Sequence, residues 1–218
     1  MTMAKKILFW AVTLIVIAAA LVGLAYWGQK STGTDTTVNE EVSVIKSDDQ
    51  VAGNRTSKVV LVEYGDFQCP ACASFEPTIV QLLKDQGDKF ALVFRHFPLI
   101  QTHKNAQLAS QASEAAGKQG KFWEYHDLLY KNQTIWASIS DPTATFTEYA
   151  KTLSLNEAQF VADMQSDAAK ERVNRDASEG LRYDVNSTPT FYLNGKKLTL
   201  RSFDELKLAV EQAIGSPQ

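Results

Sequence analysis

The sequence has few residues of the kinds that define specialised protein classes. Only 2 of its 218 residues are cysteine, and its 11 glycines and 6 prolines lie far below the roughly 25–30% of low-complexity chains. Two cysteines are too few for a disulfide-stapled small domain or for a four-cysteine zinc site. The formal net charge of −3 lacks the basic excess typical of nucleic-acid-binding domains. We therefore expect a globular protein with no nucleic acid partner.

One long apolar segment lies near the N-terminus. Residues 7–27 carry no charge and are mostly Leu, Ile, Val and Ala, and about 20 such residues span the hydrocarbon core of a bilayer. Two lysines precede the segment, so the positive-inside rule places residues 1–6 in the cytoplasm and the main body outside. We predict a signal-anchor, a single transmembrane helix that holds the protein at the cell membrane with its main domain extracytoplasmic. A cleaved signal peptide is the alternative, but its apolar core is shorter and ends in small residues, whereas this one ends in Tyr26 and Trp27.

The chain after the apolar segment divides into two parts by composition. Residues 28–57 are polar and lack a sustained apolar period, so they predict a linker, with Val42, Val44 and Ile45 as candidates for a short edge strand. Residues 58–218 are long enough to bury a core of their own. We predict a single domain there.

Hydrophobic periodicity predicts that this domain is an α/β sheet with a helical insertion at about residues 103–183. The predicted strands are residues 59–62, 90–97, 190–193 and 197–200, with a type I′ turn at Asn194-Gly195 between the last two. The predicted helices are residues 70–84, 105–116, 121–130, 143–153, 157–165 and 167–183, and a last one that follows the N-cap Ser202.

The chemistry is predicted at Cys69-Pro70-Ala71-Cys72. A CxxC pair alone is a weak signal, but Cys69 follows a predicted strand and caps a predicted helix, where backbone N–H groups and the helix dipole favour the thiolate. Cys72 lies three residues on, on the same helical face, within reach of a disulfide and farther from solvent. We therefore predict that Cys69 is the nucleophile and Cys72 the resolving thiol of a redox-active disulfide, with no other cofactor.

Two other interpretations of the cysteine pair are less favoured. A zinc site needs two more ligands, and His96, His103 and His126 do not form a pair with metal-ligand spacing, so no metal is predicted. We interpret the three histidines as packing or hydrogen-bonding residues. An inert structural disulfide would close so short a loop that it would remove little entropy from the unfolded chain.

Four segments, in this order, resemble the DsbA-like thiol-disulfide oxidoreductases of the thioredoxin fold, and most of all their membrane-anchored extracytoplasmic members. They are VEYGDFQCPAC at 62–72, RHFPL at 95–99, GKFW at 120–123 and STPT at 187–190. The resemblance covers about residues 48–214. It implies a thioredoxin fold with a helical insertion, which agrees with the predicted order of elements.

The resemblance also implies how a substrate binds. Thr188-Pro189 would be the cis-proline element that faces the cysteine pair and exposes backbone to an incoming substrate strand. Pro70, Ala71 and Thr188 are then the predicted substrate-binding residues, and Pro189 belongs to the catalytic set. An ordinary trans proline at the start of an edge strand is the alternative.

Glu63 is the remaining candidate catalytic residue. It ends a predicted apolar strand six residues before Cys69, and burial there would raise its pKa and let it carry a proton for Cys72. The resemblance implies an acid with this role at this position. A solvated carboxylate at the end of the strand is the alternative.

The function implied is the introduction of disulfides into exported proteins that arrive reduced or unfolded. The family implies that a membrane thiol oxidase of the DsbB or vitamin K epoxide reductase type reoxidises the pair. The most oxidising family members carry His where this chain has Ala71, so we predict a redox potential below theirs but above that of cytosolic thioredoxin. A disulfide isomerase or reductase of the same fold, and a tethered peptide-binding or chaperone module, are the alternatives.

Overall fold

This computed structural model describes Met3, Trp10, Thr13 and residues 38–216 of the chain. The predicted anchor, residues 7–27, therefore lies almost wholly outside the described residues, as does the start of the predicted linker. In the described part, no helix has both the length and the hydrophobicity needed to cross a membrane. The anchor stays a prediction. Everything below concerns the compact unit that begins at Val38.

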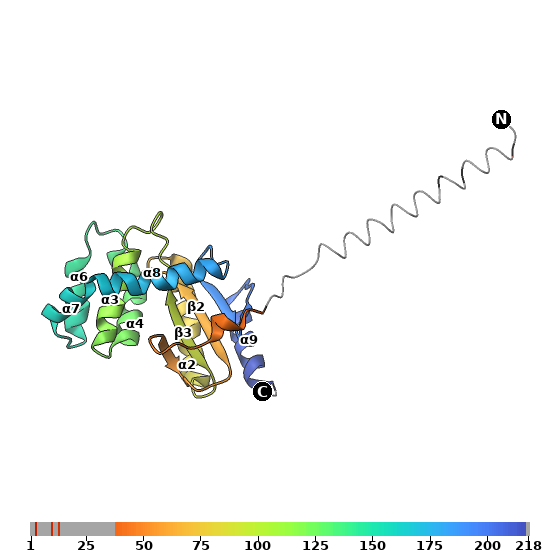
Figure 1. Cartoon of the computed structure of the whole chain (residues 1–218), viewed down its shortest axis with the longest axis horizontal. Helices are drawn as coiled ribbons and strands as arrows, with labels where there is room; N and C mark the ends of the chain where they lie inside the picture. Colours follow the sequence, from red (N-terminus) through yellow and green to blue (C-terminus); the bar gives the residue numbers. More distant parts are fainter. Residues whose placement is uncertain (1–2, 4–9, 11–12, 14–37, 217–218) are drawn as a thin grey trace. The chain divides into compact units, whose positions relative to one another are not determined.

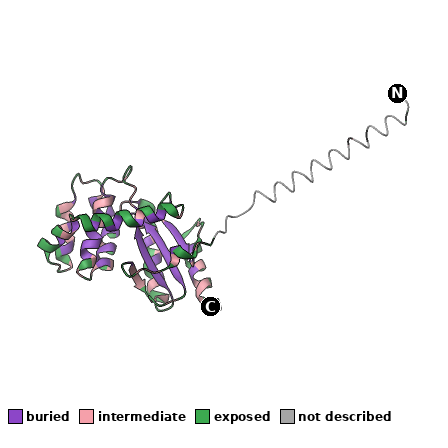
Figure 2. Cartoon of the chain, viewed as in Figure 1, coloured by how far each residue is buried: buried purple, intermediate pink, exposed green. Residues whose placement is uncertain are grey.

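A five-stranded mixed sheet forms the centre of this unit, with the strand order β1-β3-β2-β4-β5 (Figure 1). β2 and β3 are parallel, and the other neighbouring pairs are antiparallel. The strands are β1 (Gln50–Gly53), β2 (Val60–Gly65), β3 (Ala91–His96), β4 (Thr190–Leu193) and β5 (Lys196–Lys197). β2 and β3 are buried along their whole length, as Figure 2 shows, which explains why their sequences are nearly continuous apolar runs.

Helices cover both faces of the sheet and build the insertion. They are η1 (Glu40–Ser43), α2 (Pro70–Gln86), α3 (Ala106–Lys118), α4 (Phe122–Lys131), α5 (Gln133–Trp136), α6 (Thr143–Thr152), α7 (Glu157–Met164), α8 (Asp167–Arg182) and α9 (Phe203–Gly215). Side chains of α2 and α9 pack on one face, and η1 and α8 contribute to the core on the other. The insertion has its own aromatic and alanine-rich core, and α3, α4, α6 and α7 gather at the end of the unit away from α9 (Figure 1). The structure thus confirms a thioredoxin-like α/β fold with a helical insertion.

The predicted hairpin turn is confirmed. Asn194 and Gly195 have φ values of +49° and +78°, the left-handed region that a type I′ turn requires at both positions. A Cβ at Gly195 would also lie 2.7 Å from the backbone oxygen of Asn39, so the turn needs glycine for packing as well. The Asn39 amide donates to the Gly195 carbonyl at 2.9 Å.

The sequence prediction was wrong for residues 38–57, which it assigned to a linker. These residues pack on the sheet: Val42 of η1 is fully buried, and β1 pairs with β3 as an edge strand. The observed edge strand is Gln50–Gly53 and not the segment around Val44. That segment is held by polar contacts, such as the hydrogen bond from Arg95 to Val44 O, and these contacts leave no apolar pattern in the sequence. β2 also runs three residues past its predicted end, and α5 was not predicted.

Candidate active site

Cys69 is the N-cap of α2, the position predicted for it. Its backbone is extended (φ −74°, ψ 120°), and Pro70 occupies the first turn, where no N–H is needed. The Cys69 amide donates to Asp66 O at 3.0 Å, and the Cys69 carbonyl accepts from the Ala73 amide at 3.2 Å, the first bond of the helix. Cys69 and Cys72 are not joined by a disulfide in this structure. The strand-to-helix connection therefore aims the Cys69 sulfur at the N-terminus of α2.

The surroundings of Cys69 favour its thiolate. A hydrogen bond from the Cys72 side chain, with further ones from the backbone N–H groups of Cys72 and Ala71, lowers the pKa of Cys69 to about 5, although burial opposes the shift. Unpaired N–H groups at a helix N-terminus stabilise an anion in this way. At neutral pH, Cys69 is therefore mostly ionised and is a good leaving group.

Cys72 has the opposite character. Only 1% of it is exposed, against 6% for Cys69. Burial raises the pKa of Cys72 well above its usual value, and its hydrogen bond to Cys69 and the negative charge of Cys69 raise it further. The two cysteines therefore have different pKa values, because they occupy different positions on one helical turn. At neutral pH one is a thiolate and the other a thiol.

The predicted cis-proline element lies against the cysteine pair. The Thr188-Pro189 peptide bond is cis, and the Cys69 sulfur lies 3.3 Å from Thr188 O, to which it donates when protonated. Pro70 and Ala71 are exposed beside it. A pocket of about 280 Å³ is lined by Pro189 together with Phe75 and Phe191. The structure therefore places Thr188 against Cys69, and leaves Pro70 and Ala71 exposed directly after Cys69.

Glu63 lies inside β2, two residues before its end, and only 1% of it is exposed. Neither carboxyl oxygen has a hydrogen-bond partner among the described residues. Burial raises the pKa of Glu63 well above its usual value, and the charges of Glu76 and Cys69 add to the rise. The alternative of a solvated carboxylate is wrong, because the strand continues past Glu63 and α2 covers it. A neutral carboxyl group beside the cysteine pair can give up or accept a proton.

Three amide side chains that the sequence analysis missed hold the loop before Cys69. Gln133 donates to Phe67 O at 2.7 Å and to Cys69 O at 2.9 Å. Gln68 donates to Ala137 O, and Asn105 donates to Ile139 O at 2.8 Å. Buried amides follow no apolar period, so no sequence signal pointed to them.

Histidines and carboxylates form the other polar clusters near the site. His96 lies 2.9 Å from Glu114 and His103 lies 2.7 Å from Asp66, so both are hydrogen-bonded as predicted. In the described part of the chain, the groups that could meet at one metal ion are Glu76, His126 and Asp127, with ligand atoms within 4.8 Å of one another. Three ligands, one of them on an exposed side chain, fall short of a four-ligand structural zinc site, so we assign no metal there.

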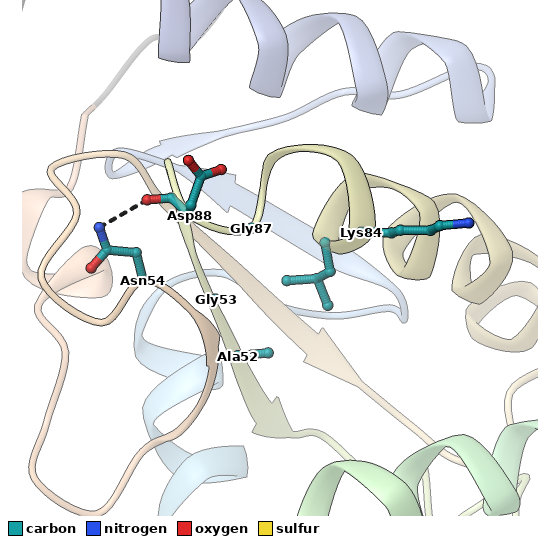
Figure 3. A pocket seen from close by; sticks show the side chains of 7 residues that line it. Ala52, Gly53, Asn54, Lys84, Gly87 and Asp88 are labelled. Atoms are coloured by element: carbon teal, nitrogen blue, oxygen red, sulfur yellow. Dashed lines mark hydrogen bonds between the residues drawn. The ribbon is translucent and has the colours of Figure 1, made fainter.

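An open depression of about 660 Å³ lies between β1 and the C-terminal end of α2 (Figure 3). Ala52, Gly53 and Lys84 line it, and Asn54 donates to Asp88 O at 3.0 Å across its rim. Because a helix rises 1.5 Å per residue, the length of α2 separates it from Cys69. We assign it no part in the chemistry at the cysteines.

Fold and site together define the class of DsbA-like thiol-disulfide oxidoreductases, and solved structures agree. BdbD from Bacillus subtilis superposes with a TM-score of 0.67 and 25% sequence identity, over 77% of this chain and 94% of that chain. Alpha-DsbA1 from Wolbachia pipientis gives a TM-score of 0.71 at 18% identity, over 81% and 96% of the two chains, and supports the fold alone.

A family model described as thioredoxin matches residues 46–212, and the chain belongs to this family. Curated relatives include the Na⁺/H⁺ antiporter NhaA 1 of Salinispora arenicola, 39% identical over 149 residues, which are 68% of this chain and 22% of that protein. Another is the Na⁺/H⁺ antiporter NhaA of Herminiimonas arsenicoxydans, 33% identical over 172 residues, 79% of this chain and 26% of that protein. The chain thus spans about a quarter or less of these relatives' length.

Proposed function

We propose that the protein is a thiol oxidase that introduces disulfides into exported proteins through Cys69 and Cys72. One observation carries the proposal: the pKa of Cys69 is lowered to about 5 while that of Cys72 is raised. A stabilised Cys69 thiolate favours the reduced form of the pair, and a pair whose reduced form is stabilised oxidises other thiols.

The first half of the reaction forms a mixed disulfide. A substrate thiolate attacks the Cys69 sulfur of the oxidised pair while the substrate backbone lies along Thr188 and Pro189. The Cys69–Cys72 bond breaks, its electron pair goes to Cys72, and Cys72 becomes a thiol by taking a proton from Glu63. The raised pKa of Glu63 favours the protonated carboxyl, which is the form that this step uses.

The second half releases the product. A second substrate thiolate attacks the substrate sulfur of the mixed disulfide, and Cys69 leaves with the bonding electrons as a stable thiolate. The substrate has lost two electrons, and the cysteine pair has gained them. The substrate's two thiol protons leave to solvent and, through Glu63, to Cys72. A membrane thiol oxidase of the DsbB or vitamin K epoxide reductase type is the proposed acceptor that restores the disulfide.

The proposed location is the outer face of the cell membrane, with residues 7–27 as the anchor. Stable disulfide chemistry needs an oxidising compartment, and the charge distribution around the apolar segment supports export of the domain. Relatives named as Na⁺/H⁺ antiporters contain a stretch similar to this chain, which also supports a place at a membrane.

The test is oxidation of a reduced, unfolded protein in a glutathione buffer. We expect the wild type to form substrate disulfides, Cys69→Ser to lose the activity to background, and Cys72→Ser to accumulate a mixed disulfide with the substrate. Equal activity of Cys69→Ser and wild type would refute the proposal and favour a peptide-binding module.

Two further measurements separate an oxidase from an isomerase or reductase. Rescue of a scrambled substrate faster than oxidation of a reduced one would favour an isomerase. Equilibrium of the Cys69–Cys72 pair with glutathione gives its potential, which we expect to lie above that of cytosolic thioredoxin and below that of family members with His at the position of Ala71. A potential at or below that of thioredoxin would favour a reductase.

A further inference from the structure

Gln133 links the helical insertion to the nucleophile loop. It lies at the start of the short helix α5, it is 8% exposed, and its amide nitrogen donates to two backbone carbonyls, Phe67 O and Cys69 O. Both bonds, at 2.7 and 2.9 Å, have good lengths for N–H···O contacts. One side chain therefore holds the backbone on both sides of Gln68, directly before α2.

Two neighbouring amides hold the Gln133 segment in turn. The Gln68 side chain accepts from the backbone N–H of Asn105 at 2.8 Å and donates to Ala137 O at 2.9 Å. Asn105 donates to Ile139 O at 2.8 Å. The loop before Cys69, the start of α3 and the segment after α5 are thus joined by side-chain amides. We call Gln68, Asn105 and Gln133 the amide clamp.

The clamp acts on the atom that carries the proposed chemistry. The N–H groups of Ala71 and Cys72 stabilise the Cys69 thiolate only if the backbone of Cys69 keeps the sulfur in front of them. Gln133 fixes the carbonyl of Cys69. Its N–H dipole also offsets the negative end of that carbonyl, which lies in the same residue as the thiolate. Both effects favour the charged form of Cys69.

We propose that Gln133 is a positioning residue that tunes the acidity of Cys69 from the helical insertion. It touches neither the substrate nor the reacting sulfurs. The inference rests on Cys69 being the nucleophile, as in the proposed function. It adds that the insertion, which lies outside the strands and helices that carry the cysteines, sets how strongly the nucleophile is ionised.

The test compares two Gln→Met variants of the full chain in the reduced state. Methionine keeps the approximate size of glutamine and removes the amide. Gln133→Met removes the two bonds to the loop, whereas Gln111→Met removes a similar bond, 2.8 Å to Met164 O, inside the insertion. Alkylation of Cys69 by iodoacetamide is followed by mass from pH 3.5 to 9.5, and unfolding of each variant is measured alongside.

We expect Gln133→Met to raise the midpoint of alkylation by about 0.5–1 pH unit, which is about a two- to fivefold lower rate at pH 5. The alkylation rate at pH 9.5, where Cys69 is ionised in both proteins, should be unchanged. Gln111→Met should keep the wild-type midpoint. A midpoint unchanged in a folded Gln133→Met variant would overturn the proposal, because a purely structural role lowers stability without moving the titration.

A measurement on the wild type keeps the proposal testable if Gln133→Met fails to fold. The side-chain amide resonances of Gln133 should shift with the same midpoint as the Cys69 titration, and those of Gln111 should not. Gln133 resonances that stay constant through that titration would overturn the proposal. If the wild type did not oxidise the substrate, but Gln133→Met still raised the alkylation midpoint of Cys69, only the proposed function would be refuted.

Discussion

The two faces of the β2–β3 pair bury charge in opposite ways. Tyr64 and Arg95 are paired across the strands and face η1 and α8, where Arg95 is fully buried among partners. It donates to Asp49 at 2.9 Å and to the carbonyls of Val42 and Val44 at 2.8 and 3.0 Å. Glu63, one residue along β2, faces the α2 side and has no hydrogen-bond partner among the described residues.

The two faces differ in the role of the buried charged group: Arg95 has a structural role, and Glu63 has a proposed chemical one. An ion with its hydrogen bonds satisfied stays charged and fixes the segments around it, here residues 42–49 against the sheet. A carboxyl group without partners is held neutral instead, and its proton is free for transfer. The same strands therefore carry an ion network on one face and the proposed proton donor on the other.

The largest expected effect is on stability, and it comes from removing Arg95 from the ion network on the η1 and α8 face. Arg95→Met leaves Asp49 buried without its main cation, so we expect the free energy of unfolding to fall by about 3–5 kcal/mol, measured by denaturant titration. The alkylation midpoint of Cys69 should not change. Adding Asp49→Leu should recover part of the loss, because the uncompensated charge is then removed. A loss below about 1 kcal/mol would show that the network is not structural.

Glu63→Gln should have the next largest effect, on activity. It removes the transferable proton at nearly constant shape, and general acid catalysis is typically worth about a hundredfold or more, so we expect substrate oxidation to slow by about that factor. Alkylation of Cys69 at pH 7 should stay within about twofold of the wild type, since the thiolate is already formed there. Substrate oxidation by Glu63→Gln at the wild-type rate would show that Glu63 does not transfer the proton.

The smallest effect is a difference in the pH dependence of stability. The folded-state pKa of Glu63 is raised, so its contribution is complete below the usual carboxyl pKa of about 4.3 and is lost as pH rises through the raised value. Relative to the wild type, Glu63→Gln should therefore gain stability as pH rises above about 4.5, until the pH passes the raised pKa of Glu63. Parallel stability curves for the two proteins would contradict an unpaired, neutral Glu63.

Local sequence patterns predicted the parts of the site that follow from a single element. Cys69 at a helix start, Cys72 on the same face and the type I′ turn at Asn194 each depend on residues a few positions apart, so spacing and turn chemistry were sufficient. Similarity to a known family was needed for Pro189, because the sequence alone allowed a trans proline equally well. Burial of Glu63 was expected, but its place inside the strand was not.

Local patterns were enough to predict the cysteine pair at a helix start, most strands and helices after residue 58, and the insertion, since periodicity and capping depend on near neighbours. Packing between distant segments was needed to show that residues 38–53 belong to the domain, that Arg95 meets Asp49, and that Gln133 reaches the carbonyl of Cys69. These polar contacts join segments about 46 to 64 residues apart. Hydrogen bonds and ion pairs of this kind depend on distances set by packing, and they leave no periodic trace in the chain.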